Sequence, residues 1–505
     1  MLHSLEARKL SAPLGMIEKS TFNIDRESLL CLGSLFCLLA LSVVRDSSLF
    51  LQYDTPAGID GYYYAIQVRS LLENGTFYYS TNTPFVLYLV SIAAKLSGDV
   101  VIAVKVTSIF LHTILSLSVF ALVASITKSM WKGLLACAVS VISVTHLIWM
   151  GEFLKQLGGL TFFFSGAACL AQNPKSNFWR LMALILFVVS IFCHKSIVFL
   201  IAVLLFLTLL FHALSKIRSS RLSVVKICAV ILFCICLPAV AAQQAVPMPQ
   251  QISETVLSAP QIPINRTAFE EKLSLLFLAP VGLVLCLKEA PAKPLRWQHY
   301  VIGVTALFTI LFTLNPLLSH EEELMTISQR LDLLAYLQIS ILLSGIVWLL
   351  SSKRVALIIS LSVTSLLLLG NNTLPIGLQP GFAAKRKMLL NDLTRVRSEI
   401  PANSIIIAPH GEQFLVTYAT GVPSQKSAMA SGGQEKNIVW LLFGAPCEAS
   451  PNATILSRNN RCSLLVSENY PLSVTDSEKS QILAMNPHLR NAPKEVIDKV
   501  LTMKN

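Results

Sequence analysis

The chain has 505 residues, of which 54% are hydrophobic and only 13% are charged, and its mean hydropathy is +0.63. A soluble fold could not bury so much apolar surface, so the composition excludes an ordinary globular enzyme and indicates a membrane protein. The net charge of +12 comes mostly from Lys and Arg between apolar runs, without a basic stripe interleaved with aromatic residues. That distribution is topological and excludes nucleic acid as a partner.

The first apolar run follows a mixed, polar stretch, residues 1–28. The run from Leu29 to Val44 ends without the small-residue cleavage site of a signal peptide, so we predict a retained helix. The stretch before it is predicted to be cytoplasmic.

Further apolar runs approach the roughly 20 residues that cross the hydrocarbon core of a bilayer. They predict an α-helical polytopic membrane protein with about 11 transmembrane helices in a domain that covers residues 29–370. The predicted spans lie near 29–44, 99–126, 132–150, 158–172, 178–193, 196–213, 224–242, 273–288, 298–316, 331–351 and 355–370.

One further apolar segment, Pro84–Ser97, is short for a span and contains Lys95. If it crossed the membrane, every later loop would change sides, so the positive-inside rule tests it. With the segment lying along the surface, about 17 Lys and Arg fall in about 67 inner residues, and about 9 fall in about 107 outer residues. We therefore predict a surface helix, which places the long loop 45–98 outside.

The tail, residues 371–505, changes character and predicts a small extracytoplasmic α/β domain. Residues 388–400 have apolar positions at helical spacing, and Pro401 ends the pattern. Buried strands are predicted at 404–408, 437–443 and 463–467, and short helices near 476–485 and 493–503. A disulfide between Cys447 and Cys462 is left open, because it would form only in an oxidising compartment.

The stretch after the first helix, "YDTPAGIDGYYYAIQVRSLLENGTF", carries the clearest chemical candidate. Asp60 precedes a helical pattern that stops at "ENG". A carboxylate at the mouth of a membrane cavity could accept a proton from an incoming hydroxyl or amine, as general-base catalysis requires. Asp is also a common N-cap residue, so a purely structural role is the alternative.

This arrangement resembles the GT-C superfamily of polytopic membrane glycosyltransferases. The Asp, the aromatic residues and the amphipathic helix ending in "ENG" look like runs in oligosaccharyltransferases, protein mannosyltransferases and lipid A aminoarabinose transferases. The next segment, "TPFVLYLVSIAAKLSGDVVIAVKVTSIF", resembles their Pro-led surface helix, Gly turn and second membrane helix. The resemblance covers roughly residues 29–195 and implies that Asp60 is the catalytic carboxylate.

The second outer turn, "MGEFLKQLGGL", falls where oligosaccharyltransferases place an acidic pair that binds a divalent metal. This chain has Glu152, but Lys155 and Gln156 stand where more acid is expected. A hard cation such as Mg²⁺ or Mn²⁺ takes several carboxylate oxygens, and this turn offers one carboxylate. Either the Lys155 ammonium replaces the metal and neutralises a donor phosphate, or Lys155 is an interfacial residue that reaches toward water.

Other ionisable residues at outer boundaries are candidates for binding the donor phosphate. His194 and Lys195 interrupt apolar sequence, where a charge is costly unless it faces a cavity or the interface. Arg330 opens a late span, and its planar donor fork suits bidentate phosphate binding. The resemblance strengthens this assignment, because the superfamily often has an Arg near the donor phosphate at this place.

The acceptor side has fewer candidates. Glu322, within the acidic run Glu321–Glu323, could hold a metal or a cationic acceptor, although such a run is more often a solvated loop. Arg69 lies on the helix after Asp60. The C-terminal domain lacks the Trp-Trp-Asp signature by which oligosaccharyltransferases recognise their peptide, which puts peptide N-glycosylation in doubt.

Together these features predict a glycosyltransferase of the cell (inner) membrane. It would move a sugar from a polyprenyl-phosphate donor to a glycan, lipid or protein acceptor at the outer face, with Asp60 as base and Asp54 as a weaker second carboxylate. One alternative is a flippase or transporter of lipid-linked intermediates, which the nearly uncharged spans disfavour. Another is a non-catalytic envelope assembly partner, in which Asp60, Glu152 and Arg330 would not converge.

Overall fold

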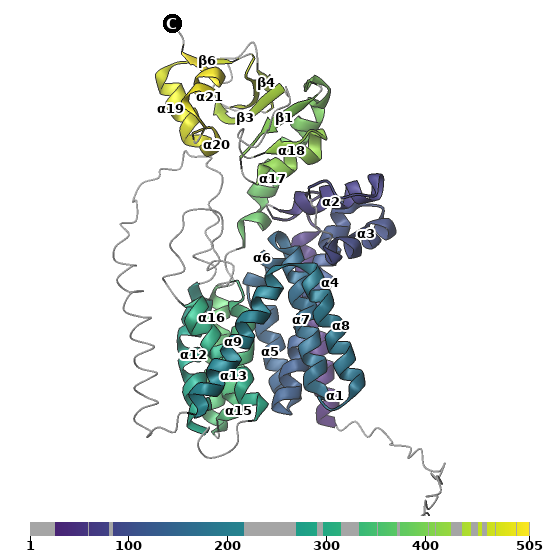
Figure 1. Cartoon of the computed structure of the whole chain (residues 1–505), viewed down its shortest axis with the longest axis vertical. Coiled ribbons are helices and arrows are strands. Elements are labelled where there is room, and N and C mark those ends of the chain that lie inside the picture. Colours follow the sequence, from purple (N-terminus) through teal and green to yellow (C-terminus); the bar gives the residue numbers. More distant parts are fainter. Residues whose placement is uncertain are drawn as a thin grey trace, which may run out of the picture.

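A computed structural model describes most of the chain. The described residues are 26–58, 60–79, 84–216, 269–289, 296–314, 333–350, 352–370, 374–401, 403–409, 411–425, 437–445, 453–456, 462–469, 471–490 and 492–503. The predicted span 224–242 and the predicted residues Glu322 and Arg330 lie outside them. A helical bundle forms one end of the molecule and a region with a β-sheet forms the other, with α2 and α3 between them (Figure 1).

The bundle consists of long apolar helices that run up and down. They are α1 (Arg26–Phe50), α4 (Val100–Thr127), α5 (Met130–Ile142), α6 (Thr145–Glu152), α7 (Leu154–Gln172), α8 (Asn177–Cys193), α9 (Ser196–Lys216), α12 (Phe269–Glu289), α13 (Trp297–Phe308, continued by a π-helical turn, Thr309–Thr313), α15 (Ala335–Leu349) and α16 (Lys353–Gly370).

Two apolar cores hold these helices together, and α15 contributes to both. The first core joins α3, α4, α6 and α7 and includes the fully buried Leu115 and Leu157. The second joins α9, α12 and α13 and includes the fully buried Phe211 and Leu278. Since close packing of this kind excludes water, the bundle interior offers room for polar groups only where they find partners.

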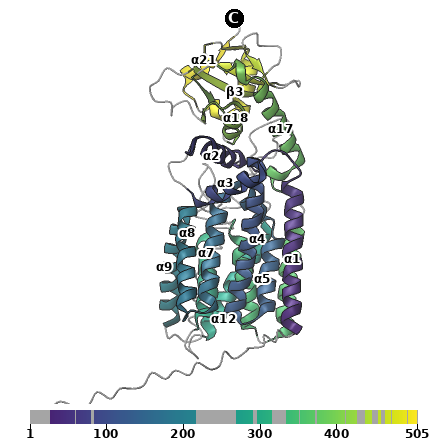
Figure 2. The same ribbon diagram turned by 90° about the vertical axis from the view of Figure 1, so that its right-hand side faces the viewer.

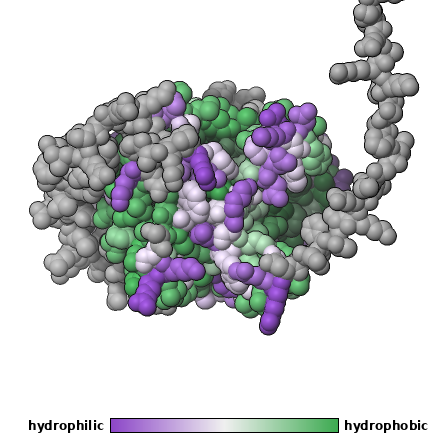
Figure 3. Space-filling view, turned by 90° about the horizontal axis from the view of Figure 1, so that it is seen from below, coloured by the Kyte–Doolittle hydropathy of each residue, from purple (hydrophilic) through white to green (hydrophobic). Residues whose placement is uncertain are grey.

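The outward faces of the bundle remain apolar, which indicates a membrane environment. Large apolar side chains are exposed on the outer helices, among them Leu184, Phe192, Leu205, Leu209 and Leu361. Among the described residues, α1 and α4 are long and apolar enough to cross a bilayer, and α5 with α6 qualifies as a bent pair. Hydrophilic side chains gather at the end of the bundle away from the sheet, with hydrophobic ones around them (Figure 3).

The helix of the predicted span 132–150 is interrupted by a break that the sequence does not predict. α5 and α6 meet at Ser143 and Val144 with a bend of 63°. The break has partners for its polar groups: the Ser143 hydroxyl and, at 2.6 Å, the Thr145 hydroxyl donate to the buried carboxylate of Glu271. A helix break at membrane depth is tolerated only where neighbouring groups satisfy the freed polar atoms in this way.

Helices α2 (Gly61–Asn74) and α3 (Phe85–Ser97) lie across the end of the bundle, as the sequence predicts for this part of the loop (Figure 2). Gly75 ends α2 in the left-handed region, with a φ of 72°. Asp99 then caps α4, since its side chain accepts the backbone N–H groups of Val101 at 2.6 Å and Ile102 at 3.0 Å.

The C-terminal elements form a five-stranded mixed sheet with helices on both faces. Its order is β2-β1-β3-β5-β4; β1 pairs in parallel with β2 and β3, and β5 pairs antiparallel with β3 and β4. The strands are β1 (Ser404–Ile407), β2 (Ser424–Gln425), β3 (Asn437–Ala445), β4 (Thr454–Ile455) and β5 (Cys462–Ser467), and a separate parallel pair joins β6 (Leu472–Val474) to β7 (Leu501–Met503).

Two helix layers cover this sheet. Helices α17 (Pro380–Arg395) and α18 (Glu412–Thr420) pack on one face, and α19 (Asp476–Met485), α20 (Pro487–Arg490) and α21 (Lys494–Val500) pack on the other. The predicted last helix is too long, because residues 501–503 form β7. Cys462 is disulfide-bonded, and Cys447 lies outside the described residues. Tyr62 of α2 is buried in the α17–α18 layer, which joins this region to the first loop.

Candidate active site

The turn that leads into α2 packs tightly against the end of α6. Gly58 has a φ of +75°, and a Cβ there would lie 2.6 Å from the carbonyl oxygen of Gly151 and 2.7 Å from Cδ of Glu152. Only glycine combines that backbone conformation with so close an approach. The loop after α1 and the end of α6, which are distant in sequence, therefore meet at this point.

Asp60 and Glu152 meet at this contact. The backbone N–H of Asp60 donates to Glu152 Oε2 at 3.0 Å, across 92 residues of sequence. Asp60 occupies the N-cap position of α2, but its side chain makes no capping hydrogen bond. Glu152 is 9% exposed, and the Tyr64 hydroxyl donates to its backbone carbonyl at 2.9 Å. The backbone of Asp60 is thus fixed at Glu152, and its side chain does not cap the helix.

Tyr64 remains a hydrogen-bond donor at any ordinary pH. Burial first, and then the negative charges of Asp60 and Glu152, raise the pKa of Tyr64 well above its usual range. The phenol therefore stays protonated and keeps its bond to the backbone of Glu152.

Lys155 lies one turn further along, against an aromatic cluster. Its Nζ donates to the Tyr63 hydroxyl at 3.0 Å and lies 4.6 Å from the centre of that ring. Tyr63 in turn contacts Tyr79, with ring centroids 6.2 Å apart, and Phe414 of α18 at 5.2 Å. The cation is therefore held by Tyr63, whose ring packs against Phe414 of the C-terminal region.

Arg386 of α17 fastens the C-terminal region to the same turn, and sequence reasoning missed it. Its side chain is 3% exposed. The guanidinium donates to the carbonyl oxygens of Gly58 and, at 3.2 Å, Gly411, lies 3.5 Å from the Glu412 carboxylate, and sits 4.8 Å from the centre of the Tyr62 ring. Its partners are far away in sequence, so no local pattern marks this residue.

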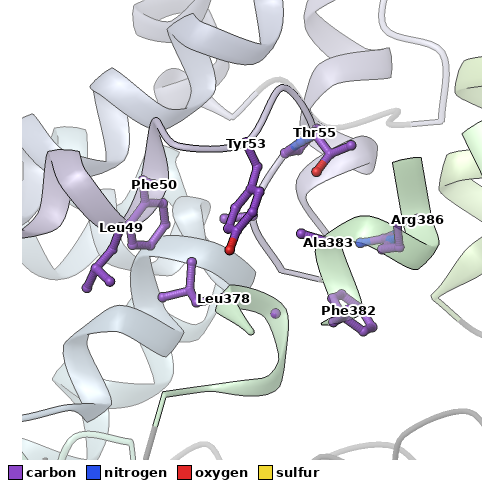
Figure 4. Close-up of a pocket in the computed structure, with 11 residues that line it drawn as sticks. Leu49, Phe50, Tyr53, Thr55, Leu378, Phe382, Ala383 and Arg386 are labelled. Atoms are coloured by element: carbon purple, nitrogen blue, oxygen red, sulfur yellow. The ribbon is translucent and has the colours of Figure 1, made fainter. Parts of the chain in front are cut away.

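A pocket opens beside this contact, between the end of α1 and α17 (Figure 4). Apolar side chains, with Tyr53 and Arg386, form its wall: Leu49, Phe50, Leu378 and Phe382 contribute most of the rest. The 3₁₀ turn Ile376–Leu378 closes it from the C-terminal side, where a Cβ on Gly377 would lie 2.7 Å from Gly58 Cα.

The second predicted carboxylate lies away from Glu152. The side chain of Asp54 is 82% exposed and pairs with Lys387 at 2.5 Å. The hydrogen bond from Lys387, and then its charge, lower the pKa of Asp54 from its usual value. Asp54 is therefore an ionised surface group in this arrangement.

Arg69 lies on the far side of α2, over the ring of Tyr418 at 3.9 Å. It borders an open cavity of about 300 Å³ between α2, α18 and the start of α4, where Glu73 and Asp99 also lie. His194 and Lys195 sit at the junction of α8 and α9, where the His194 ring contacts the Ser196 hydroxyl at 2.7 Å and Lys195 is exposed.

A second ionisable cluster lies inside the helical bundle. Asp46 of α1, His112 of α4 and His146 of α6 are all buried, and one ligand atom from each lies within 4.8 Å of the other two. His112 Nδ1 and His146 Nε2 are each 3.4 Å from a carboxylate oxygen of Asp46. The sequence feature that could have predicted this cluster is an ionisable residue inside or beside each of three apolar runs.

Fold and site together define a membrane protein whose polar site lies at one end of a helical bundle, under a mixed α/β region. No family model matches the chain, and no curated protein matches it. Solved structures do match. The oligosaccharyltransferase of Archaeoglobus fulgidus in the apo form has a TM-score of 0.50 and 10% identity over 78% of this chain and 64% of its own.

The same archaeal enzyme in complex with Zn and sulfate has a TM-score of 0.51 and 11% identity, over 77% of this chain and 62% of its own. The chain thus spans slightly less than two thirds of that enzyme's length. ArnT from Cupriavidus metallidurans, bound to undecaprenyl phosphate, is covered to 98% by 86% of this chain, at 12% identity and a lower TM-score of 0.46. The oligosaccharyltransferase is a GT-C glycosyltransferase, and the chain is similar to it in fold.

Proposed function

We propose that the chain is a membrane glycosyltransferase that moves a sugar from a polyprenyl-phosphate donor to an acceptor at the extracytoplasmic face. One observation carries the proposal: the first loop and the end of α6 bring Asp60 against Glu152. The fold shared with an oligosaccharyltransferase supports the same reaction class. A non-catalytic assembly partner would have no need for the Glu152 carboxylate to hold the backbone of Asp60 from a distant segment.

In this proposal Asp60 is the general base. Its carboxylate accepts the proton of the acceptor hydroxyl or amine as the sugar carbon is attacked, with inversion at that carbon. Glu152 holds the Asp60 backbone in place through the 3.0 Å hydrogen bond to its N–H. Asp54, paired with Lys387 at the surface, contributes at most through its charge.

Lys155 is proposed to neutralise the donor phosphate. Its ammonium is close to the Asp60–Glu152 contact, and its present partner is a neutral phenol that a phosphate could replace as acceptor. His194, Lys195 and Arg330 are proposed as further phosphate contacts from the sequence.

A divalent metal could also neutralise the phosphate of the donor. Asp60 and Glu152 would hold it, and it would supply positive charge to the leaving group. Two carboxylates are fewer than the six or so oxygen ligands that a hard cation usually takes, and one Glu152 oxygen already accepts a backbone N–H. The roles proposed for Asp60 and Lys155 therefore do not depend on a metal.

We further propose about 11 spans, with residues 1–28 cytoplasmic, 29–370 in the membrane domain and 371–505 extracytoplasmic in the cell (inner) membrane. The disulfide at Cys462 supports the outer location of the last segment, because disulfides persist in oxidising compartments. In this orientation the open cavity beside Arg69 faces the acceptor, with Glu322 as a second acceptor-side residue.

A flippase for lipid-linked intermediates is the second candidate, and the buried group of Asp46, His112 and His146 favours it. Ionisable residues inside a membrane bundle often mark a transport pathway. Transport would leave the sugar–phosphate bond intact, whereas the proposed enzyme breaks it. Release of free polyprenyl phosphate by the purified chain separates the two.

The test is a transfer assay in detergent with a panel of polyprenyl-phosphate sugars and envelope acceptors. General-base catalysis contributes about 10²–10⁴-fold, so Asp60→Asn should lower kcat by that factor with KM nearly unchanged. Asp54→Asn is the matched control and should stay within about threefold of wild type. Unchanged transfer by Asp60→Asn would refute the mechanism.

A further inference from the structure

The buried group of Asp46, His112 and His146 has the ligand types of a metal site. We propose instead that Arg45 supplies its positive charge, so that the native cluster is a neutral, metal-free ion pair that joins α1, α4 and α6. The inference concerns this cluster alone and holds whether or not the chain transfers a sugar. Neither Asp60 nor Glu152 takes part in it.

The charge of Asp46 needs a partner. Its side chain is 1% exposed, and an isolated carboxylate at such a depth is strongly disfavoured. Ser42 donates to Asp46 Oδ2 at 3.2 Å, which satisfies an oxygen but leaves the charge. Either a metal ion or a protein cation must balance it.

Arg45 meets that need with two donors. Its Nε lies 3.0 Å and its Nη2 lies 2.8 Å from Asp46 Oδ1. The same Nη2 lies 2.7 Å from His146 Nε2. One guanidinium thus binds the two atoms, Asp46 Oδ1 and His146 Nε2, through which a metal ion would be held.

The hydrogen bonds of His146 fix its tautomer. Its Nδ1 contacts the Ser143 carbonyl oxygen, which can only accept, so Nδ1 carries the proton. Nε2 of a neutral imidazole then has a lone pair, which accepts the Arg45 hydrogen. Because arginine is always protonated, the pair needs no further proton to hold together.

A metal ion and Arg45 cannot use His146 at the same time. A ring nitrogen has one lone pair, and a zinc ion would bind it at about 2.0–2.1 Å. The Arg45 nitrogen now lies in that direction, 2.7 Å away.

The charge balance favours the metal-free form. One carboxylate and one guanidinium sum to zero, and both histidines can remain neutral. Adding a divalent ion would leave a net charge of +2 among residues that are almost fully buried, which a low-dielectric interior disfavours. The Arg45 side chain is 35% exposed, so its outer part still reaches the interface.

Removal of Arg45 should therefore create a metal site. The experiment uses the full-length chain, purified in detergent with a tag free of histidine, and titrates it with Co²⁺ while visible absorption between 500 and 700 nm is recorded. Wild type should show no cobalt band from this cluster. The Arg45→Ala chain should bind one equivalent of Co²⁺ with a Kd at least 100-fold lower than that of wild type. The double variant, Arg45→Ala with His146→Ala, should lose this Co²⁺ binding. Arg45→Lys, which keeps a cation, is the matched control and should resemble wild type.

Two results would overturn the proposal. The first is that elemental analysis finds one equivalent of metal in the wild-type chain and none in the His146→Ala variant. The other is an Arg45→Ala chain that unfolds at the temperature of Arg45→Lys yet binds no more Co²⁺ than wild type. Should Arg45→Ala not fold, Arg45→Met keeps the apolar stem and carries the same expectation, and the metal content of wild type still decides.

Discussion

Gly58 shows at the scale of one residue how the site is held. Gly58 and Gly75 have nearly the same backbone conformation, with φ of +75° and +72°, but a Cβ on Gly75 would meet nothing within 4 Å. Gly75→Ala should cost about 1–2 kcal/mol from the left-handed backbone alone. Gly58→Ala adds a collision with Gly151 and Glu152, and should cost a further 1–3 kcal/mol or so.

Thermal unfolding in detergent measures both glycine variants, with Gly75→Ala as the matched control. If the two substitutions lowered the melting temperature equally, the tight contact between the loop and α6 would be absent from the folded protein.

Single residues also show which parts of the candidate site can be predicted from the sequence. Asp60 and Glu152 are predictable, because both lie in polar interruptions beside apolar runs and resemble a known family pattern. The role of Arg386 is not predictable from sequence, because its hydrogen bonds to the carbonyl oxygens of Gly58 and Gly411 exist only in the folded chain. Asp46, His112 and His146 can each be recognised in the sequence as ionisable residues in or beside apolar runs. Their contact cannot be predicted, because it depends on how three helices pack.

At the scale of elements, α17 should act as a clamp on the first loop. Arg386→Lys keeps a charge but loses the planar fork that reaches Gly58, Gly411 and Glu412 together. Amide hydrogen exchange across residues 54–60 should become at least tenfold faster in this variant, because the loop loses a buried hydrogen bond. Lys387→Gln, next to it on α17, removes only an exposed pair and should change exchange less than threefold. Equal exchange in both variants would contradict the clamp.

The layer that covers the other face of the sheet should respond to pH through His488. Burial, above all, lowers the pKa of His488 to about 4, while its Nε2 donates to the Leu441 carbonyl at 3.0 Å. An unfolded chain would take up this proton near pH 6.5, so the unfolded state binds more protons between about pH 6.5 and 4. The free energy of unfolding should therefore fall as pH drops through that window, by at most about 1.4 kcal/mol per pH unit.

Denaturant unfolding of the full chain, followed by the fluorescence of the buried Trp440, measures this effect. His488→Gln keeps a donor for Leu441 without a titrating group, so its stability should change less with pH in the same window. Identical pH profiles for the two chains would remove His488 as the cause.

The elements show the same limit of prediction. α2 and its stop at Gly75 follow from local sequence, as do the strands β1, β3 and β5, whose apolar runs are short and bounded. The break between α5 and α6 does not, because neither Pro nor Gly marks it and its stabilising carboxylate, Glu271, comes from a helix more than a hundred residues away. A broken span looks like an intact one when its partners are unknown.

At the scale of the whole molecule, the apolar bundle positions a polar end, and the C-terminal region covers that end (Figure 1). Composition alone predicts the membrane bundle. The contact of α17 and α18 with α2 requires the fold, because it is made by Tyr62, Arg386 and Tyr418 from segments more than three hundred residues apart. The contact fixes the C-terminal region against the first loop, next to the turn that carries Asp60.

The central claim is that the chain consumes a lipid-linked sugar, and the most direct measurement is mass spectrometry of polyprenyl-phosphate sugars and envelope glycans in three strains. These carry wild-type protein, the Asp60→Asn variant at equal abundance, or no protein. The account predicts that the last two strains lack the same glycan or glycolipid modification and accumulate the same polyprenyl-phosphate sugar on the outer face. An Asp60→Asn strain with wild-type glycans and no accumulated donor would contradict it.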